Sequence, residues 1–76
     1  MEKPFKTNTY QVIYEKNVDG QKKWFIYRMP EVCIDINKAM YYLSKVKVDG
    51  AIITDAKIKT IVQDVKKQGD YYVLAS

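Results

Sequence analysis

The chain offers few side chains that could act as catalysts or metal ligands. Its 76 residues include no histidine, one cysteine (Cys33) and one arginine (Arg28). Without histidine there can be no Ser-His or Cys-His nucleophile pair, and one thiol alone cannot build a conventional zinc site. A single cysteine also excludes an internal disulfide. We therefore expect no catalytic residues, no metal and no cofactor.

The remaining polar residues give no enzyme signature. The carboxylates are scattered singly, without the spacing of a paired acid and base or of a calcium loop. Glycine-rich nucleotide-binding patterns are absent, and the glycines occupy expected turn or helix-cap positions. Cys33 lies between Val32 and Ile34, which predicts a small buried hydrophobe. Some small ribonucleases use Lys, Arg and Tyr in place of histidine. This chain has a single arginine, which is too few to support that mechanism, so the sequence favours a non-enzymatic protein.

Two strand-like runs near the start of the chain predict a β-hairpin. Residues 9–16 and 22–29 are rich in β-branched and aromatic side chains, and they flank an Asp19-Gly20 turn. We favour a three-residue loop over 18–20, with Gly20 in the left-handed conformation.

That loop sets the register of the hairpin and therefore the face of each side chain. Tyr14 is expected opposite Trp24, and Glu15 opposite Lys23. One face then carries residues suited to a core: Tyr10, Val12, Tyr14, Trp24 and Ile26. The other face leaves apolar and aromatic residues without cover from the rest of the chain: Ile13, Phe25 and Tyr27.

Two amphipathic helices are predicted after the hairpin. The first runs from about Asp35, a suitable N-cap, to Val46. Its apolar residues follow the i, i+3, i+4, i+7 spacing of one helical face: Ile36, Ala39, Met40 and Leu43. The second starts at Thr54 or Asp55 and ends at Gly69. Its apolar residues have the same spacing: Ile58, Ile61, Val62 and Val65.

The remaining segments complete the expected fold. Residues 1–7 read as a loose tail, residues 51–53 as a short strand or the start of a helix, and residues 71–75 as a closing strand. The order is β-β-α-(β)-α-β. We expect one α+β domain over residues 1–76, with a small, mainly antiparallel sheet (N-terminal hairpin plus C-terminal strand) and two helices packed on one face.

The aromatic content points to a binding surface. Seven tyrosines, two phenylalanines and one tryptophan exceed what a core of this size can enclose. An exposed aromatic patch rimmed by polar groups is typical of a protein interface. We therefore expect an inhibitor or adaptor that binds a larger protein with an acidic surface; a homodimer that buries the patch is the alternative. The expected protein-binding residues are Ile13, Lys22, Lys23, Phe25, Tyr27, Arg28 and Tyr41.

The formal net charge of +4 supports a second hypothesis, a small nucleic-acid-binding protein. Its lysines would neutralise phosphates from the outer side of the second helix. The residues of this stripe are Lys59, Gln63, Lys66 and Lys67. A polar outer side is also what any amphipathic surface helix needs, and the charge is not concentrated in one segment.

Composition also suggests a setting for the protein. The N-terminal residues lack the apolar region of a signal peptide, and no apolar run reaches the roughly 20 residues that span a bilayer. We expect a cytoplasmic protein with no membrane partner. Residues of AT-rich codons are abundant, which suits an accessory protein of a phage or another mobile element.

The hairpin resembles one known family. Tyr10–Lys16, Asp19-Gly20 and Met29–Cys33 are loosely similar to the opening of HicB-like antitoxin domains, in which a hairpin precedes a proline-marked turn and a helix. The similarity covers about a third of the chain. The family's glycine after the proline and its Thr-x-Glu-Glu-Ala helix start are missing, so the resemblance indicates a shared style of hairpin.

Overall fold

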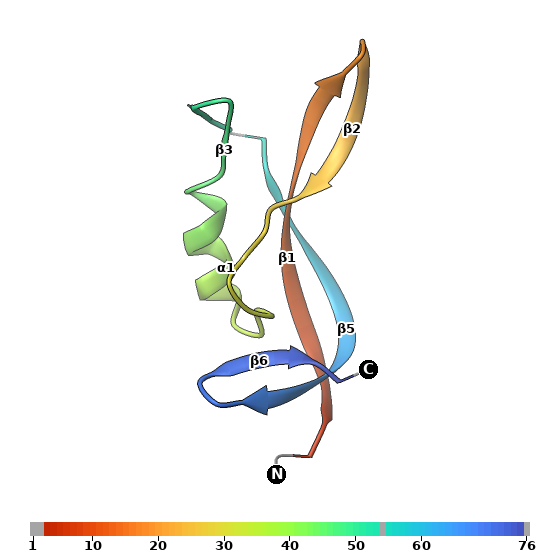
Figure 1. The fold of residues 1–76 in the computed structure, drawn as a ribbon, viewed down its shortest axis with the longest axis vertical. Coiled ribbons are helices and arrows are strands. Elements are labelled where there is room, and N and C mark those ends of the chain that lie inside the picture. The colour runs from red at the N-terminus through yellow and green to blue at the C-terminus, as the bar shows by residue number, and fades with distance from the viewer. Residues whose placement is uncertain (1–2, 54, 76) are drawn as a thin grey trace.

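The structure, a computed structural model, describes residues 3–53 and 55–75. Of these residues 56% lie in strands and 11% in a helix. The strands are β1 (Phe5–Val18), β2 (Gln21–Ile26), β3 (Lys47–Val48), β4 (Ala51–Ile52), β5 (Lys57–Gln68) and β6 (Tyr71–Leu74), and the helix is α1 (Ile36–Leu43). The expectation of an α+β fold with two helices is therefore wrong. The protein is mostly β, with one helix beside a curled antiparallel sheet (Figure 1).

Two long strands run through the centre of the sheet, whose order is β2-β1-β5-β6. β1 pairs with β5 from Phe5 to Ile13 and with β2 from Ile13 to Val18. β5 pairs with β6 through its last four residues. Each end of the central pair thus carries its own hairpin, and the molecule is elongated, 46 × 21 × 16 Å (Figure 1). Since β1 begins at Phe5, residues 5–7 are strand rather than the expected tail.

The segment expected to form the second helix is the strand β5. Five of its twelve residues are β-branched, which favours an extended backbone, and β1 supplies a partner along Lys57–Val65. The apolar residues also fit a strand that is covered on different faces along its length. Ile58 points to one face of the sheet, whereas Ile61 and Val65 point to the other. Gly69, expected to cap the helix, instead lies in the β5–β6 turn with φ 62°.

The first hairpin has a two-residue turn rather than the expected three-residue loop. Val18 pairs directly with Gln21, and the residues between them, Asp19 and Gly20, have φ values of 52° and 81°. Two positive φ values define a type I′ turn, which matches the twist of the flanking strands. The second Val-Asp-Gly sequence, at 48–50, makes the same turn between β3 and β4, with φ values of 53° and 83°.

Because the turn is one residue shorter than expected, the pairing of β1 with β2 differs by one residue from the expected register. The side chains of β2 therefore lie on the faces opposite to those expected. Tyr14 lies opposite Phe25, and Glu15 lies opposite Trp24. Because successive side chains alternate, the shift turns the whole of β2 over relative to β1. Trp24 and Ile26 therefore leave the expected core face, and Phe25 takes their place there.

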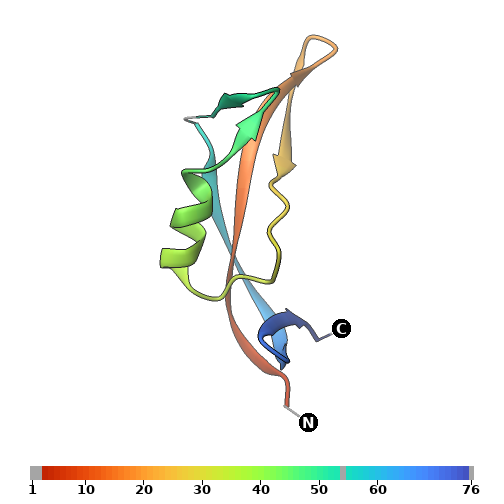
Figure 2. The same ribbon diagram turned by 60° about the vertical axis from the view of Figure 1, so that its left-hand side comes forward.

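The sheet has two different faces. The face that carries the fully buried Val12 is covered by α1 (Figure 2). We call it the helix face. The β3–β4 hairpin reaches this face through its turn, where Asp49 lies 3.5 Å from Lys16. The opposite face, which carries Ile13, is the open face. Among the described residues, six are buried: Thr9, Val12, Cys33, Ala39, Val46 and Val65.

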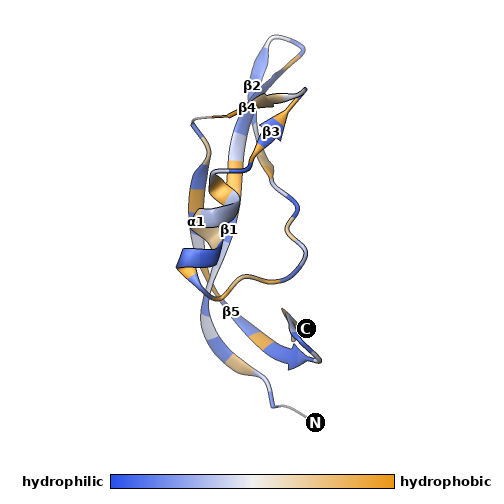
Figure 3. Cartoon of the chain, turned by 90° about the vertical axis from the view of Figure 1, so that its left-hand side faces the viewer, coloured by the Kyte–Doolittle hydropathy of each residue, from blue (hydrophilic) through white to orange (hydrophobic). Residues whose placement is uncertain are grey.

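The helix is shorter than expected but begins where the sequence indicates. The Asp35 carboxylate accepts a hydrogen bond from the Asn37 backbone N–H at 2.9 Å, as an N-cap does. Ala39 is fully buried against the sheet, whereas Ile36 and Met40 stay 47% and 54% exposed. The exposed β3–β4 hairpin also carries hydrophobic residues, coloured orange in Figure 3. Within the described residues, no helix has the length and apolar character needed to cross a membrane.

Candidate protein-binding surface

The upper part of the open face exposes two large apolar side chains side by side. Trp24 is 49% exposed and Ile26 is 62% exposed, and they occupy alternate positions of β2, so they point to the same face. Ile13, opposite Ile26, is half-buried beside them. The Lys57 Nζ atom lies 5.4 Å from the centroid of the Trp24 ring, within the range of a cation–π interaction.

A shallow hollow of about 330 Å³ lies at the foot of these side chains. Its lining combines apolar groups with one amide and one ammonium group: Gln11, Ile13, Trp24, Phe25, Ile26 and Lys59. The hollow can accept an apolar side chain, while Gln11 and Lys59 can bind a polar or anionic group of the same ligand.

The loop after β2 extends this surface downward along the edge of β1. The Tyr27 N–H donates to the Val12 carbonyl at 2.8 Å, and the Tyr10 N–H donates to the Cys33 carbonyl at 2.9 Å. At the far end of the loop, the Val32 N–H donates to the Tyr72 carbonyl of β6 at 3.1 Å. The loop is therefore fixed to both the centre of the sheet and its curled last strand.

A cavity of about 610 Å³ opens between this loop and β6. Thr9, Gln11 and Gln63 contribute to its sheet side, and the Thr9 hydroxyl lies 2.8 Å from both the Ile61 carbonyl and the Gln63 side-chain oxygen. The cavity shares Gln11 and Ile26 with the upper hollow. We call the two together the binding groove.

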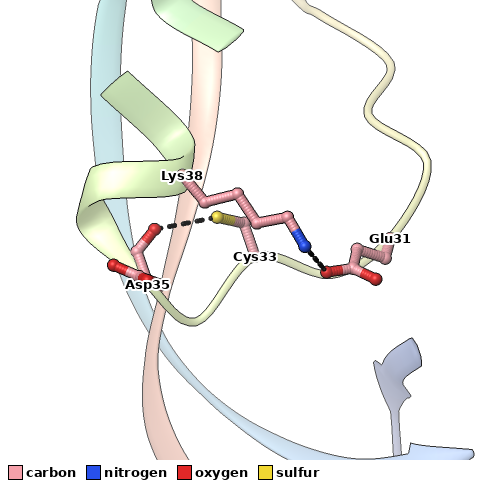
Figure 4. Close-up of polar contacts among 4 residues, drawn as sticks. All are labelled: Glu31, Cys33, Asp35 and Lys38. Carbon is pink, nitrogen blue, oxygen red and sulfur yellow. Dashed lines mark hydrogen bonds and ion pairs between the residues drawn. The ribbon is translucent and has the colours of Figure 1, made fainter. Parts of the chain in front are cut away.

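Two side-chain contacts hold the loop against α1 (Figure 4). The Lys38 ammonium donates to the Glu31 carboxylate, and the Cys33 thiol donates to the Asp35 carbonyl at 3.1 Å. The hydrogen bond to Glu31 raises the pKa of Lys38 above its ordinary value near 10.5. Cys33 is 2% exposed, which confirms the prediction of a small buried hydrophobe.

The charged groups around the binding groove are mainly basic. Lys59 and Arg28 line it, and Lys57 lies over Trp24. Of the acidic groups nearby, Glu31 is neutralised by Lys38, and Glu15 lies 3.9 Å from Lys22. The groove thus suits a ligand that carries negative charge beside apolar groups.

The structure brings together only some of the residues expected to bind a protein. Ile13 lines the upper hollow, and Tyr27 and Arg28 line the lower cavity. Lys22 lies on the open face but pairs with Glu15. These residues form one surface, although Tyr27 is only partly exposed.

Three other expected residues lie elsewhere. Phe25 stacks on Tyr14 toward the helix face, with ring centroids 5.7 Å apart and planes 22° apart, although it borders the upper hollow. Lys23 alternates with Trp24 and so also belongs to the helix face. Tyr41 is exposed on α1, where the Lys45 ammonium lies 5.3 Å from its ring centroid.

The lysine stripe expected to bind nucleic acid was placed on a helix, but its residues lie on the strand β5 and therefore do not all share one face. Lys59, Gln63 and Lys67 are four residues apart along β5, so all three belong to the open face, whereas Lys66 points to the opposite face. Sequence reasoning missed Trp24 and Ile26 as residues of this exposed surface. The preference of Asp-Gly for a two-residue turn was the signal that would have found them.

Comparisons with protein-family models, curated proteins and solved structures found no significant match to this chain.

Proposed function

We propose that this protein is a non-enzymatic binding protein, an inhibitor or adaptor, that holds an acidic segment of a larger protein in the binding groove. The observation that carries the proposal is the exposure of Trp24 and Ile26, side by side on the open face and above a hollow. Tryptophan is enriched among residues that dominate protein interfaces. A small domain that leaves such residues in water gains stability when a partner covers them.

The magnitude supports a protein-sized ligand. Full burial of a large apolar side chain contributes about 1.5–3 kcal/mol, and roughly half of each side chain is still exposed here. Covering Trp24 and Ile26 therefore contributes on the order of 2–3 kcal/mol. That is a useful anchor but less than specific binding requires, so contacts along the lower cavity must add to it.

The charges support an acidic partner. Lys57, Lys59 and Arg28 surround the apolar groups, and none of the three forms an ion pair with a carboxylate of the residues that the structure describes. Basic groups at the rim of an interface raise the association rate with an acidic surface and disfavour basic partners. Substitution of these residues should reduce the association rate and its dependence on salt.

The test compares capture of a partner by the wild type and by the double variant Trp24→Ala, Ile26→Ala. The bait is incubated with nuclease-treated lysate of the source cells, and captured proteins are identified and purified. Ile52→Ala is the matched control, because Ile52 is 62% exposed, like Ile26, but lies on the β3–β4 hairpin. We expect the double variant to lose the partner and Ile52→Ala to keep it.

Since Trp24 is the only tryptophan, its fluorescence reports directly on the groove. Titration with the purified partner should shift the emission of the wild type and of Ile52→Ala. Capture that persists in the double variant, or a titration that leaves the emission unchanged, contradicts the proposal.

One observation favours a second candidate, a protein that binds single-stranded nucleic acid. Trp24 offers a ring for stacking on a base, with Lys57 and Lys59 on the same face to neutralise phosphates. Such binding must weaken steeply as salt rises. Binding of a generic oligonucleotide at about 50 mM salt that is lost in Trp24→Ala would favour this candidate over the protein partner.

A further inference from the structure

The outer edge of β5 is an open strand edge. β1 occupies one edge of β5, and β6 covers the other only from Val65 to Gln68. Beyond β6, the Asp64 carbonyl accepts a hydrogen bond from the Ala75 N–H at 2.9 Å. Because backbone groups alternate along a strand, Ile58, Thr60 and Val62 direct their N–H and C=O groups to the same edge as Asp64. No strand among the described residues pairs with them.

On the helix face, this edge lacks the features that usually prevent edge pairing. The residues that direct their backbone outward are β-branched and uncharged, and the edge has no proline. Their side chains belong to the helix face, and Val62 is 59% exposed there. Lys57 and Lys59 point to the open face. A second strand can therefore approach without meeting a charge on the helix face.

The helix presents apolar side chains beside the same edge. Lys38 extends from α1 toward Glu31, in the loop along the β1 side of the sheet (Figure 4). With 100° per residue, Ile36 and Met40 lie on the flank of α1 opposite Lys38, which is the β5 side. Both are about half exposed. Val62 is also exposed, so Ile36, Met40 and Val62 give this side of the molecule three exposed apolar side chains.

We propose that a second copy of this chain pairs antiparallel with the β5 edge, around a two-fold axis through Thr60. Ile58 then lies opposite Val62 of the second copy, and Thr60 lies opposite Thr60. Each of these residues donates one backbone hydrogen bond and accepts one, because all three direct their backbone outward. The two four-stranded sheets become one continuous sheet, with both helices on the same side.

Charge and hydrogen bonding favour the axis through Thr60 over axes through the adjacent residues, Lys59 and Ile61. An axis through Lys59 would place two Lys59 side chains directly opposite each other, which is destabilising. An axis through Ile61 would place Ile58 opposite Asp64, whose carbonyl already bonds Ala75. The axis through Thr60 places Lys59 opposite Ile61 and Lys57 opposite Gln63, so no like charges face each other.

A second copy suits this edge better than an unrelated strand. A two-fold interface requires one surface to complement itself. Here each copy supplies both the outward backbone of Ile58, Thr60 and Val62 and the apolar flank of Ile36 and Met40. Two such flanks approach each other across the axis and can cover each other, whereas an isolated strand would leave them in water.

The first experiment measures mass by sedimentation equilibrium from about 1 µM to about 1 mM. The wild type should approach twice its chain mass of 8.9 kDa. Val62→Lys should raise the dissociation constant about 100-fold or more, because it places an uncompensated charge in the interface. Ile52→Lys, at a residue of similar exposure outside the interface, should leave the constant unchanged. A monomeric wild type, or a dimer unaffected by Val62→Lys, overturns the proposal.

The second experiment tests the register itself. Residues opposite each other as a hydrogen-bonded pair have Cα atoms about 5.5 Å apart, within the range of a disulfide. Under mild oxidation Thr60→Cys should form a covalent dimer rapidly, and Ile52→Cys should not. Cys33 is buried and serves as the internal control for nonspecific oxidation. Equal rates for the two variants, in proteins that keep the wild-type circular dichroism, exclude pairing about Thr60.

Discussion

The assignment of residues 57–68 as a strand can be tested with one substitution made at two valines. Val65 is fully buried, whereas Val62 is 59% exposed on the opposite face. A helix over this segment would place both valines on one buried face with Ile58 and Ile61. Val→Thr keeps the shape and the β-branch while replacing a methyl group with a hydroxyl. The strand predicts that this change matters only at the buried Val65, whereas a helix predicts similar losses at both valines.

The magnitudes follow from burial. A hydroxyl buried without a partner costs about 1–3 kcal/mol, so Val65→Thr should lower the free energy of unfolding by that amount. A core of this size supplies only about 3–5 kcal/mol, which makes the loss a large fraction of the total. The melting temperature should fall by about 4–8 °C per kcal/mol. Val62→Thr should change the free energy of unfolding by less than about 0.5 kcal/mol.

The assay is equilibrium unfolding in urea, followed by far-ultraviolet circular dichroism. A protein concentration of about 1 µM keeps self-association from contributing to the stability. Similar losses in Val62→Thr and Val65→Thr would refute the strand and its faces, because only a shared buried face makes the two positions equivalent. A larger loss at position 62 would refute them as well.

Three further predictions concern the turn, the loop and the thiol. Gly20→Ala should cost about 1–2 kcal/mol in urea unfolding, because Gly20 has φ 81°, whereas a cost near zero contradicts the type I′ turn. The raised pKa of Lys38 means that its pair with Glu31 stabilises the fold fully below pH 10.5 and that this contribution disappears as pH rises above that value. Glu31→Gln should therefore flatten the fall in melting temperature above pH 10.5; an unchanged fall excludes the pair as its cause. Cys33, 2% exposed, should react with a thiol reagent only at the rate of unfolding, and rapid reaction in the native protein excludes its burial.

Local signals in the sequence predicted the two strands and the start of the helix in the first half of the chain. The strand-like runs, the Asp-Gly turn and the Asp35 cap all depend on neighbouring residues, and each is present in the structure. The register was wrong because it depended on a choice between a two-residue and a three-residue turn. That single choice exchanged Trp24 with Phe25 and so misplaced the centre of the proposed binding surface.

The second half depended on distant residues. The apolar spacing of 58, 61, 62 and 65 fits a helical face, but it also fits a strand covered on opposite faces at its two ends. Residues 57–68 form a strand because β1, which lies about fifty residues earlier in the chain, pairs with β5 along Lys57–Val65. No pattern within residues 55–68 reveals that partner. The lysine stripe was misread for the same reason, since it assumed helical geometry.

The two proposed interfaces should respond to salt in opposite directions. In the proposed pairing the two Lys59 side chains are diagonal neighbours about 7–8 Å apart, so they repel each other weakly. Screening over about 10 Å at 0.1 M salt, and about 3 Å at 1 M, reduces that repulsion and should strengthen self-association. The same screening weakens the attraction of Lys57, Lys59 and Arg28 for an acidic partner. Sedimentation and fluorescence titration across this range should therefore give opposite trends, and parallel trends would show that one of the two surfaces is wrongly assigned.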